Sequence, residues 1–273
     1  MRSEMDEWAK HGLMTFPGRY ASRLRTLPAE MPELCAAIRG LVIHYRSSSL
    51  PARTAAHRLD EVRLRRVTLM LRRLLALDSR PLREHRPPSR RIIGCCRDFA
   101  VLLCATLRER GLPARVRVGF ADYVGTAGWT DHWLTEYWDR RHRRWTRVDV
   151  EFGELDVPPQ RFILAGDAWI AWRSGALPAQ TFGYDAEARG ASVILANVLH
   201  DVACLSRVET TPWDFWGLAL KPLVDLSQRE LALLDVAAKS TIAGRSPRAR
   251  DLQAPRTVVS YSIGDERSTA RLC

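Results

Sequence analysis

The chain contains almost no lysine. Only Lys10, Lys221 and Lys239 are present among 273 residues, so the cations behind the formal net charge of +11 are nearly all arginines. Proteins that bind nucleic acids gather their cations into clusters that release counterions from phosphate. Here the arginines are spread over every segment, as coding bias in a GC-rich genome would give. We therefore expect no nucleic-acid partner, although a basic face would speed association with an acidic protein.

Long hydrophobic runs are also missing. The opening sequence MRSEMDEWAKHG carries acidic residues and Trp8 where a secretory leader has its apolar core. The longest apolar stretches, around Leu41 to Ile43 and Val193 to Leu199, are interrupted well short of a bilayer span. We expect a cytoplasmic protein that neither enters nor crosses a membrane.

The spacing of the cysteines does not indicate a disulfide framework. Six of them are scattered over a chain long enough to bury a core without disulfides, at positions 35, 95, 96, 104, 204 and 273. Zinc sites need two closely spaced pairs of Cys or His, and the adjacent Cys95 and Cys96 cannot form such a pair. The pattern predicts a reducing compartment, no metal and no cofactor.

Helical patterns dominate both ends of the chain. Apolar residues recur at helical spacing in segments 27–45 and 60–78, and the proline-containing segment 79–91 follows as a linker. Helical patterns return after Pro158, most clearly in 192–208 and 227–240, and the tail from about Arg245 looks weakly ordered. We predict an N-terminal helical region (1–90), a catalytic core (91–157) and a C-terminal helical region (158–273), packed as one compact unit.

The middle of the chain changes from helix to strand. Segment 96–110 is helical and is stopped by Gly111 and Pro113. Three segments with alternating apolar and polar residues follow, at 114–120, 132–139 and 144–152, and the last two predict a hairpin closed by the exposed basic turn RRHRR. This order predicts an α+β fold rather than a parallel βαβ series.

Three residues in this core have the chemistry of a thiol enzyme. Cys96 lies at the start of the predicted helix, where the helix dipole favours the thiolate and free backbone N–H groups can receive an oxyanion. Gly94 would let a substrate approach closely. His132 opens the second predicted strand beside a polar loop, and Asp149 ends the third strand, so pairing across the hairpin can bring the carboxylate to the imidazole.

The same residues carry a family resemblance. The run GCCRDFAVLLCATLRERGLPARVRVGF, then DHWLTEYW, then RWTRVD, resembles the transglutaminase core over about residues 94–149. The resemblance implies a papain-like fold in which the cysteine-bearing helix packs on a small antiparallel sheet. It also implies Cys96 as nucleophile, His132 as general base and then acid, and Asp149 as the orienting carboxylate. Trp129 and Trp133 would shield the thioester from water.

Several neighbouring residues have more than one interpretation. Cys95 is predicted to pack beside the site and line it, with a smaller chance that it is the nucleophile itself. Trp133 is as well explained by strand packing. Arg97 and Asp98 would set the helix start, and Trp213 and Trp216 would either line the cleft or anchor a helix. Two further residues are predicted to be structural, namely Cys104 and Arg115.

The predicted reaction is amide-bond formation through a Cys96 thioester. Some bacterial transglutaminase homologues condense an acyl group from a carrier-protein thioester with an amine in antibiotic assembly lines. That resemblance makes an acidic acyl or peptidyl carrier protein the expected donor partner, with a small-molecule or peptide amine as acceptor. Hydrolysis by the same triad, as an amidase or peptidase, is the alternative, and a non-catalytic binding module with a papain-like core is a third hypothesis.

Overall fold

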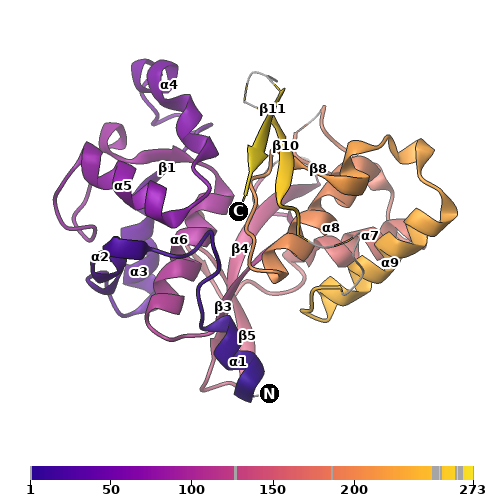
Figure 1. Cartoon of the computed structure of the whole chain (residues 1–273), viewed down its shortest axis with the longest axis horizontal. Helices are drawn as coiled ribbons and strands as arrows, with labels where there is room; N and C mark the ends of the chain where they lie inside the picture. The colour runs from indigo at the N-terminus through magenta and orange to yellow at the C-terminus, as the bar shows by residue number, and fades with distance from the viewer. Residues whose placement is uncertain are drawn as a thin grey trace. The chain divides into compact units, whose positions relative to one another are not determined.

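The protein is a mixed fold of helices and mainly antiparallel strands (Figure 1), and this confirms the predicted α+β class. The structure is a computed structural model that describes residues 2–125, 128–185, 187–247, 252, 254–261, 263 and 267–272. The chain forms two compact units. Unit 1 comprises Met1–Val116 and Leu134–Val157, and unit 2 comprises Arg117–Trp133 and Pro158–Cys273.

Two long strands, β3 (Ala114–Ala121) and β4 (Trp129–Asp139), contribute residues to both units. The strand order of their sheet is β6-β5-β4-β3-β7. In unit 1, β4 pairs antiparallel with β5 (Arg144–Asp149), and β5 pairs with β6 (Glu154–Leu155). The predicted hairpin is thus confirmed, and its turn at residues 140–143 is exposed as expected.

The helix that bears Cys96 is the centre of unit 1. This helix, α6 (Cys96–Glu109), contacts the surrounding helices and β1, and all of its residues except Cys96 and Glu109 are buried. The Thr135 hydroxyl donates to the Ala100 carbonyl oxygen at 2.8 Å and fixes β4 against the helix. The other unit 1 helices are α1 (Arg2–Trp8), α2 (Ala21–Arg25), α3 (Met31–Arg39), α4 (Ala52–Arg58) and α5 (Val67–Leu77), with 3-10 turns at Gly18–Tyr20, Leu59–Arg63 and Pro88–Arg90.

The prediction of a wholly helical first region is wrong at one place. Residues Val42–His44 form β1, which pairs in parallel with β2 (Ile92–Gly94) directly before α6. The helix predicted over 27–45 therefore ends at Arg39, where α3 stops before Gly40. Pairing with a strand distant in sequence overrides the local helical pattern.

The helix predicted over 60–78 is also interrupted. Its first part is the 3-10 turn Leu59–Arg63, and α5 begins only at Val67. The reason is the buried Arg97, whose guanidinium donates to the carbonyl oxygens of Leu64 at 3.2 Å and Arg65 at 2.5 Å. Because those carbonyls are taken by a side chain from α6, the backbone leaves the helix there.

Segment 79–91 is non-helical apart from its 3-10 turn, but it is packed rather than loose. Leu82 and Arg86 are fully buried. The Arg86 guanidinium donates to several backbone carbonyl oxygens of its own loop, those of Asp78, Arg80, Pro81, Leu82 and Glu84. One arginine therefore satisfies the backbone of a segment whose composition looks like a linker.

Unit 2 is built around three mutually packed helices, α7 (Ala165–Arg173), α8 (Ala191–Leu205) and α9 (Gln228–Ile242) (Figure 1). A buried ion pair ties them to β3, because Arg117 binds Asp201 through Nε at 3.0 Å and Nη2 at 2.8 Å. Helix α9 starts with a capping box formed by Ser227 and Glu230. Short strands complete the unit, namely β7 (Phe162–Leu164), β8 (Phe182–Gly183) and β9 (Asp214–Phe215), with 3-10 turns at Ala179–Thr181, Gly217–Leu220 and Leu223–Asp225.

The C-terminal tail contains regular structure. Strands β10 (Thr257–Tyr261) and β11 (Arg267–Arg271) form an antiparallel hairpin, and β10 also pairs with β9. The prediction of a weakly ordered tail is therefore wrong for these residues, although part of the tail lies outside the described residues. Among the residues that the structure describes, no helix is both long and apolar enough to span a bilayer.

Candidate active site

The start of α6 is fixed by a capping box. Cys95 is the N-cap residue, with extended backbone at φ −135°. Its backbone N–H donates to Asp98 Oδ2 at 2.9 Å, and its side chain accepts a hydrogen bond from the Asp98 backbone. Arg97 holds the other oxygen of the same carboxylate at 2.9 Å, with both side chains buried. The prediction that Arg97 and Asp98 set the helix start is confirmed, and the position of Cys96 at the first turn follows from it.

The two adjacent cysteines have different environments. Cys95 is 3% exposed, and burial raises the pKa of its thiol, although a hydrogen bond with Cys96 opposes the rise. Cys96 is half-buried and begins the helix, at the positive end of the helix dipole. Burial disfavours a thiolate at Cys95, whereas partial exposure and the dipole favour one at Cys96. This contrast supports the choice of Cys96 over Cys95 as nucleophile.

Asp149 ends β5 in a well-defined turn of unit 1. Its side chain is 1% exposed, and its Oδ1 accepts from the Phe152 backbone N–H at 3.3 Å. Arg39 holds the same turn by donating to the Val150 carbonyl oxygen at 3.2 Å. Gly153 has φ +75°, and a Cβ there would lie 2.5 Å from Arg39 Nη1. The carboxylate predicted to orient the base is therefore buried and held in one position.

His132 is buried within β4, in the part of the strand that belongs to unit 2. Its ring lies 6.1 Å from the Tyr123 ring, edge to face. The prediction that His132 opens its strand is wrong, because β4 begins at Trp129. The extra residues pair in parallel with β8, Trp129 with Phe182 and Thr130 with Gly183, and this pairing was not visible in the local sequence.

The residue before His132 is also ionisable. Asp131 is half-buried in unit 2, and Asn197 donates to its Oδ1 at 3.1 Å. Burial raises the pKa of this carboxyl to about 6, while His132 and the Asn197 hydrogen bond oppose the rise. A carboxyl that titrates close to neutral pH therefore adjoins the candidate general base.

The other predicted site residues have packing roles that the structure makes explicit. A Cβ on Gly94 would lie 2.6 Å from Asp98 Oδ2 and 2.9 Å from Val42 Cγ1, so the glycine is needed where β2 passes α6. Trp133 is 1% exposed and its ring centroid lies 5.3 Å from that of His200. Trp129 is half-exposed. Their roles toward substrate remain predictions.

The structure shows the surroundings of the two tryptophans with an open interpretation and of the two residues that were predicted to be structural. Trp216 packs on His200 with ring centroids 5.3 Å apart, in the interior of unit 2. The Trp213 carbonyl oxygen accepts from Tyr261 N–H at 3.1 Å beside β10. Cys104 is fully buried, and Arg115 pairs with Glu136 at 2.8 Å while stacking on Trp145. The structural interpretation of Cys104 and Arg115 is confirmed.

The sequence did not indicate one acidic residue that lies close to the candidate nucleophile. A carboxylate oxygen of Glu151 lies within 4.8 Å of Cys96 Sγ, and both side chains are half-buried in unit 1. Glu151 also lines a cavity of about 390 Å³ together with residues of β1 and α6. The only sequence signal was an acid two positions after Asp149, which looks like an ordinary continuation of an alternating strand. The turn that ends β5 at Asp149 is what brings Glu151 to the sulfur.

Comparison with known proteins gives one family and one solved structure. The model of the transglutaminase-like superfamily matches residues 63–150, which include Cys96, His132 and Asp149. The chain also aligns with a crystal structure described as a "Putative Cysteine Protease from Cytophaga hutchinsonii". That alignment has 17% sequence identity and a TM-score of 0.35, and covers 62% of this chain and 50% of the other.

The chain thus spans about half the length of the solved protein that it matches. No curated protein matches it. The family match supports a cysteine-based enzyme, since the matched segment contains the complete predicted triad. Residues 63–150 of this chain are therefore similar to the transglutaminase-like superfamily.

Proposed function

We propose that the protein is a thiol acyltransferase that forms amide bonds through a thioester on Cys96. The Cys96 thiolate attacks the carbonyl carbon of an acyl donor, and the leaving group departs with a proton from His132. An amine then attacks the acyl-enzyme: a C–N bond forms, the C–S bond breaks, and the proton lost by nitrogen returns through His132 to the sulfur.

The placement of Cys96 is the observation that carries this proposal. Within α6 it is one of only two residues that are not buried, and the other, Glu109, is at the opposite end. The backbone N–H groups that open a helix have no acceptor within the helix. That of Asp98 is taken by the Cys95 cap, so we assign the oxyanion of a tetrahedral intermediate to the N–H of Cys96. The dipole favours the thiolate at the same point.

The strand order supports the roles of His132 and Asp149. His132 lies on β4, and Asp149 ends β5, which pairs antiparallel with β4 over Thr135 to Asp139. The sequence order Cys96, His132, Asp149 is the order that the resemblance to the transglutaminase core implies.

A cavity lined by Glu151, whose carboxylate lies within 4.8 Å of Cys96 Sγ, supports transfer rather than hydrolysis. A hydrolase needs only water as acceptor, whereas a transferase needs a place for the amine next to the thioester. The cavity of about 390 Å³ in unit 1, lined by Glu151, offers such a place. For the donor we propose a carrier-protein thioester, as in natural-product assembly, because a net charge of +11 attracts acidic domains of that kind.

The proposal is tested by trapping the acyl-enzyme. Incubation with an acyl thioester should add one acyl mass to the wild-type protein, located on Cys96 by peptide mapping. Cys96→Ala should show no adduct, and the matched Cys95→Ala should still acquire it. An adduct that persists in Cys96→Ala and vanishes in Cys95→Ala would overturn the assignment of the nucleophile.

The acceptor decides between the two reactions. Addition of a primary amine to the acyl-enzyme should yield the amide, detected by its mass. Release of free acid alone across a broad panel of amines would instead establish the hydrolase.

A further inference from the structure

Cys96 does not itself line the cavity in unit 1, but three of the lining residues are close to it through the helix, the strand pairing or direct proximity. Phe99 lines it from α6, three residues after Cys96, and residues three apart share a helix face. His44 lines it from β1, where it pairs with Gly94, two residues before Cys96. Glu151 lines it from the turn after β5, within 4.8 Å of Cys96 Sγ. A group bound to Glu151 in this cavity would therefore lie close to a thioester on Cys96.

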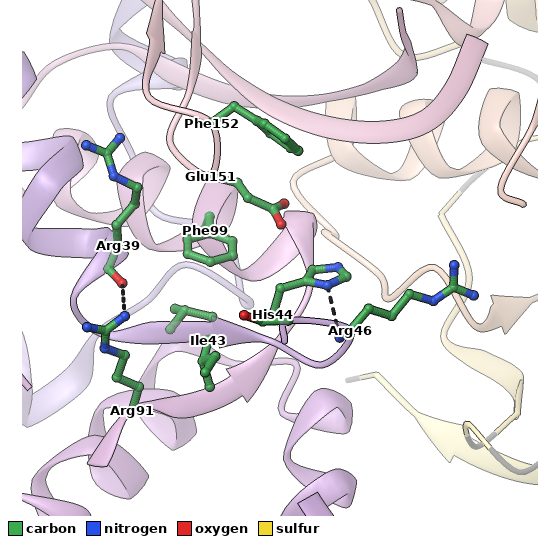
Figure 2. A pocket seen from close by; sticks show the side chains of 10 residues that line it. Arg39, Ile43, His44, Arg46, Arg91, Phe99, Glu151 and Phe152 are labelled. Atoms are coloured by element: carbon green, nitrogen blue, oxygen red, sulfur yellow. Dashed lines mark hydrogen bonds between the residues drawn. The ribbon is translucent and has the colours of Figure 1, made fainter. Parts of the chain in front are cut away.

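The residues that line the cavity include several arginines and one acidic residue. Arg39, Arg46 and Arg91 line the cavity, and Glu151 is the one acidic residue among its lining residues. Figure 2 shows Arg39 and Arg91 at one end of the cavity, Arg46 at the other, and the Glu151 carboxylate directed toward the side where the His44 ring lies. A cavity with this balance favours a ligand with a negative group and one positive group.

The cationic residues differ in how they are held. Arg91 donates through Nε to the Arg86 carbonyl oxygen at 2.9 Å, and Arg39 donates to that of Val150. Arg46 is exposed. Its backbone N–H donates to His44 Nδ1 at 3.2 Å, so the neutral His44 ring carries its proton on Nε2, where it is a donor. Arg46 and His44 Nε2 thus supply donors for an anion at the end of the cavity opposite Arg39 and Arg91.

The remaining wall is apolar. Val42, Ile43 and Phe99 are buried on one side, and Phe152 contributes a ring that is 45% exposed. Figure 2 shows the Phe99 and Phe152 rings on either side of Glu151. An aliphatic side chain would remove these apolar surfaces from water.

We propose, on the basis of the acyl-transfer function above, that the acceptor is a free amino acid with an apolar side chain. Glu151 binds the ammonium group beside Cys96, and Arg46 with His44 binds the carboxylate. The aliphatic part lies against Phe99 and Phe152. This assigns Glu151 and Arg46 as residues that determine the specificity for the acceptor.

The chemistry balances with groups already present. Bound ammonium gives one proton to the Glu151 carboxylate, which passes it to solvent, and the neutral amine attacks the thioester carbonyl. The new C–N bond forms as the C–S bond breaks, and the second proton of the amine goes through His132 to the Cys96 sulfur. The product is an N-acyl amino acid, and no oxidant, reductant or cofactor is consumed.

Binding can be measured without turnover. We choose L-leucine, isopentylamine and 4-methylpentanoate, which share one aliphatic chain and differ in whether they carry both charged groups, the amine alone or the carboxylate alone. Titration of Cys96→Ala, followed by saturation-transfer NMR, should show L-leucine binding at least about tenfold more tightly than either partial ligand, as expected for losing one charge-assisted contact.

Variants in the Cys96→Ala background locate the site. Arg46→Gln should weaken L-leucine binding about tenfold, and Glu151→Gln by a similar factor. Arg53→Gln, which removes an exposed arginine of α4 outside the cavity lining, is the matched control and should leave binding unchanged. Equal binding of all three ligands, or equal effects of Arg46→Gln and Arg53→Gln, would overturn the proposal.

Turnover separates this inference from the function on which it rests. With acyl-enzyme formed on the otherwise wild-type protein, L-leucine should give amide with kcat/KM about tenfold or more above isopentylamine, and Arg46→Gln should narrow that ratio. If the acyl-enzyme forms but both amines react equally, the acceptor assignment fails and the acyltransferase stands. If no acyl-enzyme forms although L-leucine binds as described, the cavity assignment stands and the acyltransferase fails.

Discussion

At the scale of single residues, neighbouring side chains of the same chemical type differ in how deeply they are buried. Cys95 and Cys96 are adjacent, yet one is a buried N-cap with a raised pKa and the other is half-exposed at the helix start. Asp149 and Glu151 are two residues apart. The first is buried and fixed by the Phe152 N–H, and the second is half-buried beside Cys96. In each pair one side chain is buried and the other is half-buried.

Replacement of Asp149 by Asn tests the orienting role. The asparagine Oδ1 can still accept from the Phe152 N–H, so the turn and the thermal midpoint should be preserved. The amide cannot stabilise an imidazolium, so kcat should fall by about 10²–10⁴-fold. Steady-state kinetics and circular dichroism measure the two quantities. A variant that keeps most of its activity would remove Asp149 from the mechanism.

The buried His200 gives a pH-dependent stability. Burial lowers the pKa of its imidazole to about 4, with Asp214 opposing the shift, while an unfolded chain has a value near 6.5. The unfolded state therefore binds the proton first, so the contribution of His200 is complete above about pH 6.5 and is lost as the pH falls toward 4. Over that window the free energy of unfolding should decrease by roughly 3 kcal/mol.

Comparison with His200→Gln isolates this effect. Glutamine can keep a hydrogen bond to the Thr210 hydroxyl, which His200 Nδ1 contacts at 2.8 Å, and it does not titrate. Asp131 acts in the opposite sense, because its raised pKa stabilises the fold at low pH and the contribution is lost as the pH rises through about 6. The quantity to measure is thus the difference in urea unfolding between wild type and variant at each pH. A difference that does not change between pH 7 and 4 would contradict the assignment.

At the scale of elements, buried arginines position the strands and helices. Arg97 binds the carbonyl oxygens of Leu64 and Arg65 between the 3-10 turn and α5, and Arg86 binds several carbonyl oxygens of one loop. Arg117 joins β3 to α8 through Asp201 and to α9 through the Thr241 carbonyl oxygen at 2.8 Å. Some of the arginines are therefore buried. Their guanidinium groups donate hydrogen bonds to backbone carbonyl oxygens that water would otherwise have to satisfy.

The Arg117–Asp201 pair provides the sharpest test at this scale. Asp201→Asn leaves the Arg117 charge buried without a compensating anion, so the free energy of unfolding should fall by about 3 kcal/mol or more. The control is Asp122→Asn, which weakens an exposed pair with Arg161 in the same unit and should cost under about 1 kcal/mol. Urea denaturation measures both. Equal losses would show that burial of the pair is unimportant.

At the scale of the whole molecule, the net charge of +11 predicts how a protein donor would associate. Long-range attraction raises the association rate and is screened by salt, with a Debye length of about 10 Å at 0.1 M. If the donor is an acidic carrier protein, kcat/KM should fall at least about tenfold between 50 and 500 mM NaCl. An uncharged small-molecule thioester with the same acyl group is the control and should vary little. Parallel salt profiles would argue against a carrier-protein partner.

The sequence by itself determined the local elements of the core and the candidate triad. The helix from Cys96, the β4–β5 hairpin and helices α8 and α9 followed from periodicity, capping and turn signals, which act over a few residues. Cys96 and Asp149 were identified because a helix start and a strand end are local features, whereas His132 lies inside its strand and rests on the resemblance to the family, which also assigned the order of the three residues. The contrast in burial between Cys95 and Cys96 needed the structure, because burial is a property of packing.

Only the tertiary structure decided the features that depend on contacts between distant segments. β1 became a strand because β2, fifty residues later, pairs with it, and β4 was extended by β8. The helix break before α5 came from Arg97, and the place of Glu151 beside Cys96 came from the turn at Asp149. These outcomes rest on pairing and burial between segments far apart in the chain, and a local pattern of residue types carries no record of which partner a segment will meet.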